Sequence, residues 1–157
     1  MTERLVRRQC RRPKQEPLMN LDIQIADSLT EDQVHDLVRL YQSEWWTGGR
    51  IEPQVREMLQ NCDVIVALSD KQTGRLVGFA RVLTDFVYKA LIFDVIVDSG
   101  YRSKGLGQML MDHIVNHPNL RSVKHLELYC VSEMVPFYRR WDFTTEIGEL
   151  QLMRREG

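Results

Sequence analysis

The sequence is poor in cysteine and contains no long apolar run. Its three cysteines, Cys10, Cys62 and Cys130, show neither paired nor metal-ligand spacing. An odd number of cysteines without a secretory signal is typical of reduced thiols inside a cell. No apolar run approaches the length that spans a membrane, and the four histidines share no metal-ligand spacing. We therefore predict a cytoplasmic protein that has neither a metal site nor a membrane partner.

An excess of either charge is also lacking. The 157 residues include 21 Lys and Arg against 22 Asp and Glu, for a net charge of −1. This balance argues against nucleic acid as a partner, because nucleic-acid binding needs a basic field. Residues 1–20 nevertheless contain six Lys and Arg against two Asp and Glu, and a nucleic-acid contact through them is the weaker alternative. We predict a flexible basic extension over residues 1–20 and one folded domain over residues 21–157.

Hydrophobic periodicity and turn signals predict an α/β fold. Alternating or β-branched runs predict strands over residues 21–26, 63–69, 76–83, 89–97 and 123–131, with one or two closing strands in 143–153. Helices are predicted after a capping box at residues 30–33, over 51–59, over 103–117 and from Pro136 to about Trp141. Strands 89–97 and 123–131 must run parallel if they pair across the helix between them. The predicted architecture is a mixed sheet, antiparallel in its first half with a central parallel pair, flanked by about four helices.

The most informative segment is the basic loop that opens the predicted helix 103–117. Gly105 and Gly107 lie in its first turn, where each glycine costs about 1 kcal/mol relative to alanine. Arg102 and Lys104 place positive charge at a helix N-terminus, where the macrodipole disfavours it. Both costs are explained if an anion binds there, because glycines let backbone N–H groups approach it closely. The loop therefore predicts a phosphate or pyrophosphate site.

Two segments together carry a family resemblance. Residues 102–107 read R-S-K-G-L-G and match the R/Q-x-x-G-x-G/A signature of the GCN5-related N-acetyltransferases, the GNAT family. As in that family, the signature follows a strand and opens a helix. Residues 136–143 read P-F-Y-R-R-W-D-F and resemble the F-Y-x-x-x-G-F segment of the family. The resemblance covers roughly residues 21–153.

Two other glycine-loop patterns do not fit. A dinucleotide-binding fingerprint needs a third glycine, and Leu110 occupies that position. A Walker loop needs G-K-[ST], whereas Lys104 precedes both glycines.

The resemblance implies acetyl-CoA as the cofactor. Backbone groups of Ile96 and Val97 would bind the pantetheine arm in the manner of an added strand, and one N–H group of that strand would hold the developing oxyanion. The resemblance places the pyrophosphate on the N–H groups of Arg102, Ser103, Lys104, Gly105, Leu106 and Gly107.

The resemblance also makes Tyr138 the candidate catalytic side chain. An amine that attacks the thioester expels a thiolate, and a phenol with a pKa near 10 can protonate it. Packing of the ring on the sheet is the alternative role. The sequence departs from the family at Asp142, where glycine is usual, and at Val131, where many members carry asparagine. Asp tolerates the left-handed conformation that a glycine would take at this helix end.

The sequence does not decide which residue is the general base, and Asp94 is the first candidate. This residue lies on the predicted cofactor strand and can act either as the base or as a structural acceptor. Family members often have two tandem acids in this region, and here the neighbour is Phe93. Regular strand alternation places Phe93 and Asp94 on opposite faces of the sheet. Glu127 on the next strand is a weaker candidate.

Paired indoles mark a candidate acceptor pocket. Trp45 and Trp46 adjoin Gly48 and Gly49 at a predicted helix end, where they can line a pocket or serve as buried anchors. The resemblance implies an N-acetyltransferase that moves acetyl directly from acetyl-CoA to the primary amine of a small-molecule or peptide acceptor. The alternative is a non-catalytic acyl-CoA-binding sensor or interaction module. A homodimer is the default oligomeric state.

Overall fold

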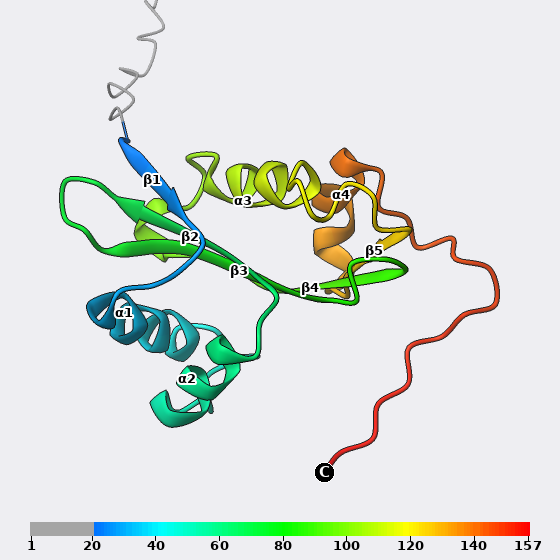
Figure 1. The fold of residues 1–157 in the computed structure, drawn as a ribbon, viewed down its shortest axis with the longest axis horizontal. Helices are drawn as coiled ribbons and strands as arrows, with labels where there is room; N and C mark the ends of the chain where they lie inside the picture. Colours follow the sequence, from blue (N-terminus) through cyan, green and yellow to red (C-terminus); the bar gives the residue numbers. More distant parts are fainter. Residues whose placement is uncertain (1–20) are drawn as a thin grey trace, which may run out of the picture.

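The computed structural model describes residues 21–157, which form a five-stranded sheet covered by helices on both faces (Figure 1). The strands are β1 Ile23–Ala26, β2 Val64–Asp70, β3 Leu76–Thr84, β4 Lys89–Val97 and β5 His125–Glu127, in that order across the sheet. β1 to β4 pair antiparallel, and β4 pairs with β5 in parallel. The predicted α/β class and mixed sheet are therefore confirmed. The predicted extension over residues 1–20 lies outside the described residues.

Helices α1 (Glu31–Gln42) and α2 (Glu52–Gln60) lie on one face of the sheet, while α3 (Leu106–Val115) and α4 (Val135–Tyr138) lie on the other (Figure 1). Single 3-10 turns occupy Ser99–Tyr101, Ser132–Met134 and Arg139–Trp141. The predicted capping box of α1 is present, with the Gln33 N–H donating to the Thr30 hydroxyl and the Gln33 side chain accepting from the Thr30 N–H. α3 begins later than predicted, because Gly105 takes a left-handed conformation at its N-cap. No helix in residues 21–157 is long and apolar enough to cross a bilayer.

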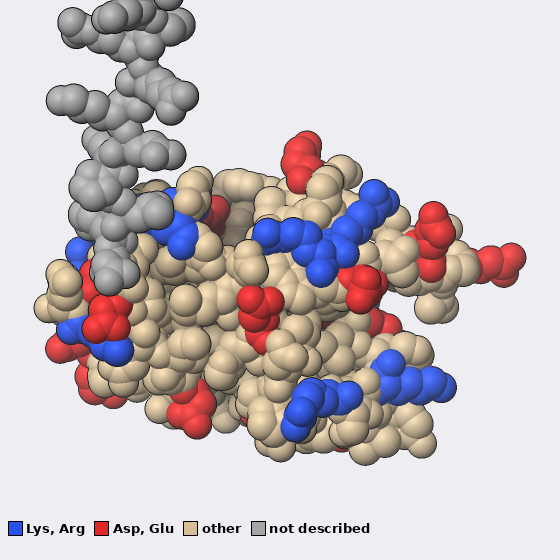
Figure 2. Space-filling view, turned by 90° about the horizontal axis from the view of Figure 1, so that it is seen from above, with Lys and Arg blue, Asp and Glu red and all other residues tan. Residues whose placement is uncertain are grey.

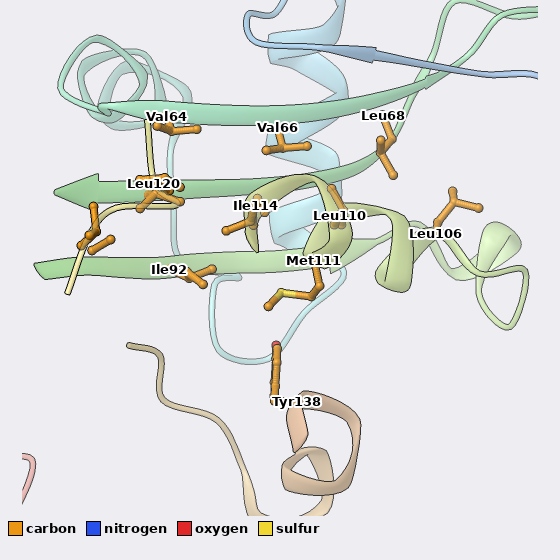
Figure 3. Close-up of a cluster of buried hydrophobic side chains, with 14 of the residues drawn as sticks. Val64, Val66, Leu68, Ile92, Leu106, Leu110, Met111, Ile114, Leu120 and Tyr138 are labelled. Carbon is orange, nitrogen blue, oxygen red and sulfur yellow. The ribbon is translucent and has the colours of Figure 1, made fainter. Parts of the chain in front are cut away.

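The sheet separates two apolar cores. Figure 3 shows the larger one, where α3 residues pack on alternate side chains of the strands and Tyr138 approaches from α4. Its members include Val64, Val66, Leu68, Ile92, Leu106, Leu110, Met111 and Ile114. The smaller core lies under α1 and α2 and includes Leu37, Leu40, Tyr41, Val55, Phe79 and Ile96. Ile92 and Ile96 are four residues apart on β4 yet face opposite cores, so the alternation of β4 changes phase between them.

A bulge in β4 causes that change of phase. Phe79 pairs with Ile96 and Arg81 pairs with Phe93, so that three steps along β4 oppose two along β3. Asp94 absorbs the extra residue with a left-handed φ of 56°. Phe93 and Asp94 consequently share the α1 and α2 face, since Arg81 contacts both side chains. The expectation that they lie on opposite faces is therefore wrong, because it assumed a regular strand.

The last fifteen residues depart from prediction as well. No strand forms within residues 143–157 of the described chain, which leave the sheet as an extended segment (Figure 1). The apolar side chains whose alternation predicted closing strands are exposed, namely Ile147, Leu150, Leu152 and Met153. The prediction was wrong because alternation indicates a strand only where one face is buried. The parallel pair of β4 and β5 therefore lies at the end of the sheet.

The Asp94 carboxylate joins the bulge to α1 and to the loop between α1 and α2. It accepts hydrogen bonds from the Tyr41 hydroxyl at 2.9 Å, from both terminal nitrogens of Arg50 at 2.7 and 3.0 Å, and from Arg81 Nε at 2.6 Å. Burial raises the pKa of this carboxyl, but the hydrogen bonds from Arg50 and Arg81 outweigh it, so the net pKa lies below the usual value. Asp94 is therefore an ionised, fully bonded carboxylate at neutral pH.

We expect Asp94→Asn to lower the free energy of unfolding by about 3–5 kcal/mol at neutral pH, because it leaves two guanidinium groups without their buried partner. The lowered pKa means that this stabilisation is present above the unfolded-state pKa of about 4 and is lost as the pH falls below it. Urea unfolding at neutral and acidic pH measures both effects. The control is Asp22→Asn, which breaks the exposed pair with Lys71 and should cost less than about 1 kcal/mol. Equal costs for the two variants would show that the cluster does not stabilise the bulge.

Candidate active site

β4 and β5 part after a short pairing. Their ladder covers only Lys89, Ala90 and Leu91 on β4, opposite residues 125–127. Beyond Leu91 the β5-side edge of β4 has no strand partner among residues 21–157. A parallel edge that opens toward the carboxyl ends of its strands is a common place for ligands to bind in α/β sheets.

The two predicted cofactor positions on β4 face different ways. The Asp98 N–H donates to the Val77 carbonyl at 2.9 Å, so the alternating backbone groups of Ile96 also point toward β3. The N–H and C=O of Val97 point to the open side. Of the two, Val97 thus offers its backbone to a ligand, whereas the backbone of Ile96 is used in the sheet and its side chain lies in the smaller core.

The predicted anion loop lies next to this open edge, between β4 and α3. Ser103 and Gly105 have left-handed φ values of 60° and 84°, and such alternation turns successive N–H groups toward one side. The N–H groups of residues 103–107 donate to no acceptor in the described part of the chain. Gly107 serves packing, because a Cβ there would lie 3.3 Å from the Phe137 ring. Free amide donors and a helix N-terminus therefore meet at the carboxyl end of β4.

The two cations of the loop differ in availability. Arg102 Nε donates to the Val97 carbonyl at 3.2 Å, and its guanidinium pairs with Glu44. Lys104 Nζ donates to the Gly100 carbonyl at 3.0 Å and has no carboxylate partner among residues 21–157. Lys104 therefore keeps an uncompensated charge beside the free N–H groups. On the face seen in Figure 2, basic and acidic side chains are interspersed, so attraction of an anion depends on this local charge.

Tyr138 is a buried phenol with an accessible hydroxyl. Its ring packs at right angles on Phe137, with the centroids 5.0 Å apart, and Figure 3 shows it extending from α4 toward Met111. The hydroxyl has no hydrogen-bond partner among the described residues. Every fully buried polar side-chain atom of these residues does have a partner. The hydroxyl oxygen must therefore reach a surface. Burial and the neighbouring Cys130 raise its pKa to about 12, so the phenol stays protonated at neutral pH.

Asp142 takes the place of the usual glycine without changing its conformation. It closes the turn after α4 with a left-handed φ of 63°, the conformation expected there. A residue other than glycine therefore supplies the left-handed conformation that ends this turn.

Neither candidate base is a free carboxylate. Asp94 is held by Arg50, Arg81 and Tyr41 and has a lowered pKa, which makes it a poor proton acceptor. Glu127 is exposed and pairs with Lys89. In the described chain no three His, Cys, Asp or Glu side chains gather in a way that could hold a metal ion.

Trp45 and Trp46 lie in the turn after α1, where their side chains are 83% and 42% exposed. The turn itself is fixed, because the Thr47 hydroxyl donates to the Tyr41 carbonyl at 2.9 Å and Glu44 pairs with Arg102. The indoles are therefore exposed near the anion loop and are not buried anchors.

Sequence reasoning missed the arginines. Arg50 and Arg81 organise the buried polar cluster, and neither was expected at the site. Arg81 gave a signal, because a charged residue inside an apolar strand needs a buried partner. Asp94 on the neighbouring strand could have been recognised as that partner.

Comparisons with known proteins identify the family. Residues 60–145 match the family model of the acetyltransferase (GNAT) domain. An uncharacterised N-acetyltransferase, ycf52, of Gracilaria tenuistipitata var. liui is 30% identical over 72% of this chain and 63% of its own length. Histone acetyltransferase TAP1 of Glycine max is 28% identical over 85% of this chain and 61% of its own. The chain thus spans about three fifths of the length of these curated relatives.

The fold comparison agrees with the sequence comparison. A crystal structure from Xanthomonas campestris, described as belonging to the GNAT family, superposes with a TM-score of 0.74 at 25% identity. The superposition covers 86% of this chain and 93% of that one. With a matched domain model, related N-acetyltransferases and the same fold, this chain belongs to the GNAT family of acetyltransferases.

Proposed function

We propose that the protein transfers the acetyl group of acetyl-CoA to a primary amine by direct attack within a ternary complex. The observation that carries this proposal is the junction of the free N–H groups of residues 103–107 with the open edge of β4. A diphosphate fits the first feature and an extended amide-containing arm fits the second. Acetyl-CoA contains both a diphosphate and, attached to it, an extended arm with amide groups.

In this proposal each part of the site has a separate task. The N–H groups of residues 103–107 and the Lys104 ammonium bind the diphosphate, and Val97 offers its N–H to the arm, since its carbonyl accepts from Arg102. The bulge at Asp94 interrupts the ladder, and a free N–H of this segment is suited to hold the developing oxyanion. Asp94 acts as a positioning residue that fixes the bulge, and the proton of the acceptor ammonium passes to solvent.

Tyr138 acts as the proton donor in this scheme. Its hydroxyl is accessible and protonated at neutral pH. Nitrogen attacks the carbonyl carbon to form a tetrahedral oxyanion, and when this collapses the carbon–sulfur bond breaks and its electron pair goes to sulfur, which takes the phenol proton. The nitrogen loses its remaining extra proton to solvent, and solvent returns a proton to the Tyr138 oxygen. The Glycine max relative TAP1 is described as a histone acetyltransferase. For this chain we propose a primary amine of either a small molecule or a peptide. A cytoplasmic location and a homodimer stay predictions.

Acetyl-CoA should raise the melting temperature of the protein, and Gly105→Ala should weaken this shift, with affinity about tenfold lower. Gly105 has a left-handed φ of 84°, so a side chain costs about 1–2 kcal/mol and moves the loop. The control is Gly74→Ala in the turn between β2 and β3, which has a left-handed φ of 72° and, like Gly105, no atom near the added Cβ. Thermal unfolding with and without acetyl-CoA should separate the two variants. No shift in the unaltered protein, or equal shifts in both variants, would contradict the proposed cofactor site.

Tyr138→Phe should lower kcat about a hundredfold and leave acetyl-CoA affinity unchanged, because it removes the proton donor but keeps the ring. The raised pKa predicts that kcat does not fall through loss of the Tyr138 proton until the pH approaches about 12. Thiol release over a panel of amines measures the rate. Tyr88→Phe is the control, since that side chain is exposed in the turn between β3 and β4.

Equal rates in both tyrosine variants would remove Tyr138 from catalysis. Acetyl-CoA binding without thiol release on any amine would favour the alternative function, a non-catalytic acyl-CoA sensor.

A further inference from the structure

A cavity on the α1 and α2 face of the sheet has no role in the function proposed above. Its volume is about 250 Å³, and it is lined by Arg50, Gln54, Val55, Met58 and Arg81. The two charged residues among these are both arginines. Val55 and Met58 make part of its wall apolar, so the cavity combines a cationic end with room for a short hydrocarbon chain.

The charge of the cavity is not balanced internally. Asp94 neutralises one of the two guanidinium groups that contact it, which leaves one positive charge in surplus. In residues 21–157 no acid other than Asp94 forms an ion pair with Arg50 or Arg81, and Glu52 and Glu44 pair instead with Arg56 and Arg102. The side chains of Arg50 and Arg81 are 30% and 11% exposed, and a surplus charge that is partly removed from water is stabilised when an opposite charge reaches it.

The terminal nitrogens of Arg81 have no oxygen acceptor within the described part of the chain. Its Nε donates to Asp94, but its terminal nitrogens donate to no oxygen atom of the described residues. No fully buried polar side-chain atom in residues 21–157 lacks a partner, so each of these nitrogens either reaches an open surface or contacts the Cys62 sulfur beside it. Arg81 lines the cavity, and a terminal nitrogen that Cys62 does not engage can donate to an oxyanion there.

A chain of contacts links the cavity to the gap between β4 and β5. The Arg81 guanidinium stacks on the Phe93 ring at 4.5 Å, and Phe93 meets Tyr129 edge to face with centroids 6.0 Å apart. Phe93 lies on β4 and Tyr129 follows β5, so the two rings bridge the strands where they part. The cavity therefore adjoins the place where the proposed function puts the acetyl group, on the face opposite Tyr138.

We propose that the acceptor amine carries a carboxylate, which binds in this cavity to Arg81 and Arg50. A single surplus charge matches a carboxylate better than a doubly charged phosphate, and guanidinium groups bind carboxylates with matched geometry. The carboxylate positions the substrate, and its amine extends past Phe93 to the open edge of β4. This assignment rests on the proposed acetyl transfer and adds the chemical class of the acceptor.

Matched amines test the assignment. We expect kcat/KM for γ-aminobutyrate or ε-aminocaproate to exceed that for n-butylamine or n-hexylamine at least about tenfold, as for a charge-assisted hydrogen bond. Arg50→Gln should abolish the preference, and Arg50→Lys should restore part of it. The control is Arg56→Gln, because Arg56 lies on α2, pairs with Glu52 and Glu31 and does not line the cavity. Equal kcat/KM for charged and neutral amines in the unaltered protein would overturn the proposal.

A binding measurement separates failure of the cavity from failure of acetyl transfer. Glutarate is titrated by calorimetry into the CoA-saturated protein, so that the anion loop is already occupied. Binding that Arg50→Gln weakens at least about tenfold and Arg56→Gln leaves unchanged supports the cavity even if no amine is acetylated, an outcome that would count against the proposed function alone. Absence of glutarate binding, or preference for aminoethylphosphonate over β-alanine, would overturn the carboxylate assignment.

Discussion

The extra residue in β4 is the constraint on which the rest of the site depends. A left-handed backbone at Asp94 costs about 1–2 kcal/mol, and the carboxylate offsets this cost by accepting hydrogen bonds from Tyr41, Arg50 and Arg81. The bulge reverses the alternation of the strand. Ile92 thereby packs under α3 while Ile96 packs under α1, and one strand completes both cores.

This bulge also places different chemistry on the two faces of one gap. From the α3 side come the free N–H groups of residues 103–107 and the protonated Tyr138 hydroxyl. From the α1 and α2 side come the arginine-lined cavity and the exposed indoles. In the proposed function, acyl donor and acceptor therefore approach the same stretch of β4 from separate directions, as direct transfer requires.

Much of this arrangement was predictable from local patterns. The capping box, the bounds of the strand Lys89–Val97 and the position of the glycine loop before α3 all rest on interactions between residues close in sequence. The bulge could not be predicted in the same way. Phe93 and Asp94 face the same side of the sheet, and the sequence of apolar and polar residues along the strand does not reveal where such an extra residue lies. The cluster of Arg50, Arg81 and Asp94 joins three separate segments, and only the burial of charge in strands hinted at it. The prediction of closing strands was wrong because apolar and polar residues alternate in residues 143–153 but the apolar side chains there are not buried.

Amide hydrogen exchange with and without CoA reports on the N–H groups at the start of α3. If the diphosphate binds the N–H groups at the start of α3, residues 103–107 and Val97 should exchange more slowly in the complex, while the turn around Gly74 should not change. Protection confined to other parts of the chain, with the N–H groups of residues 103–107 exchanging as fast as in the free protein, would contradict the account.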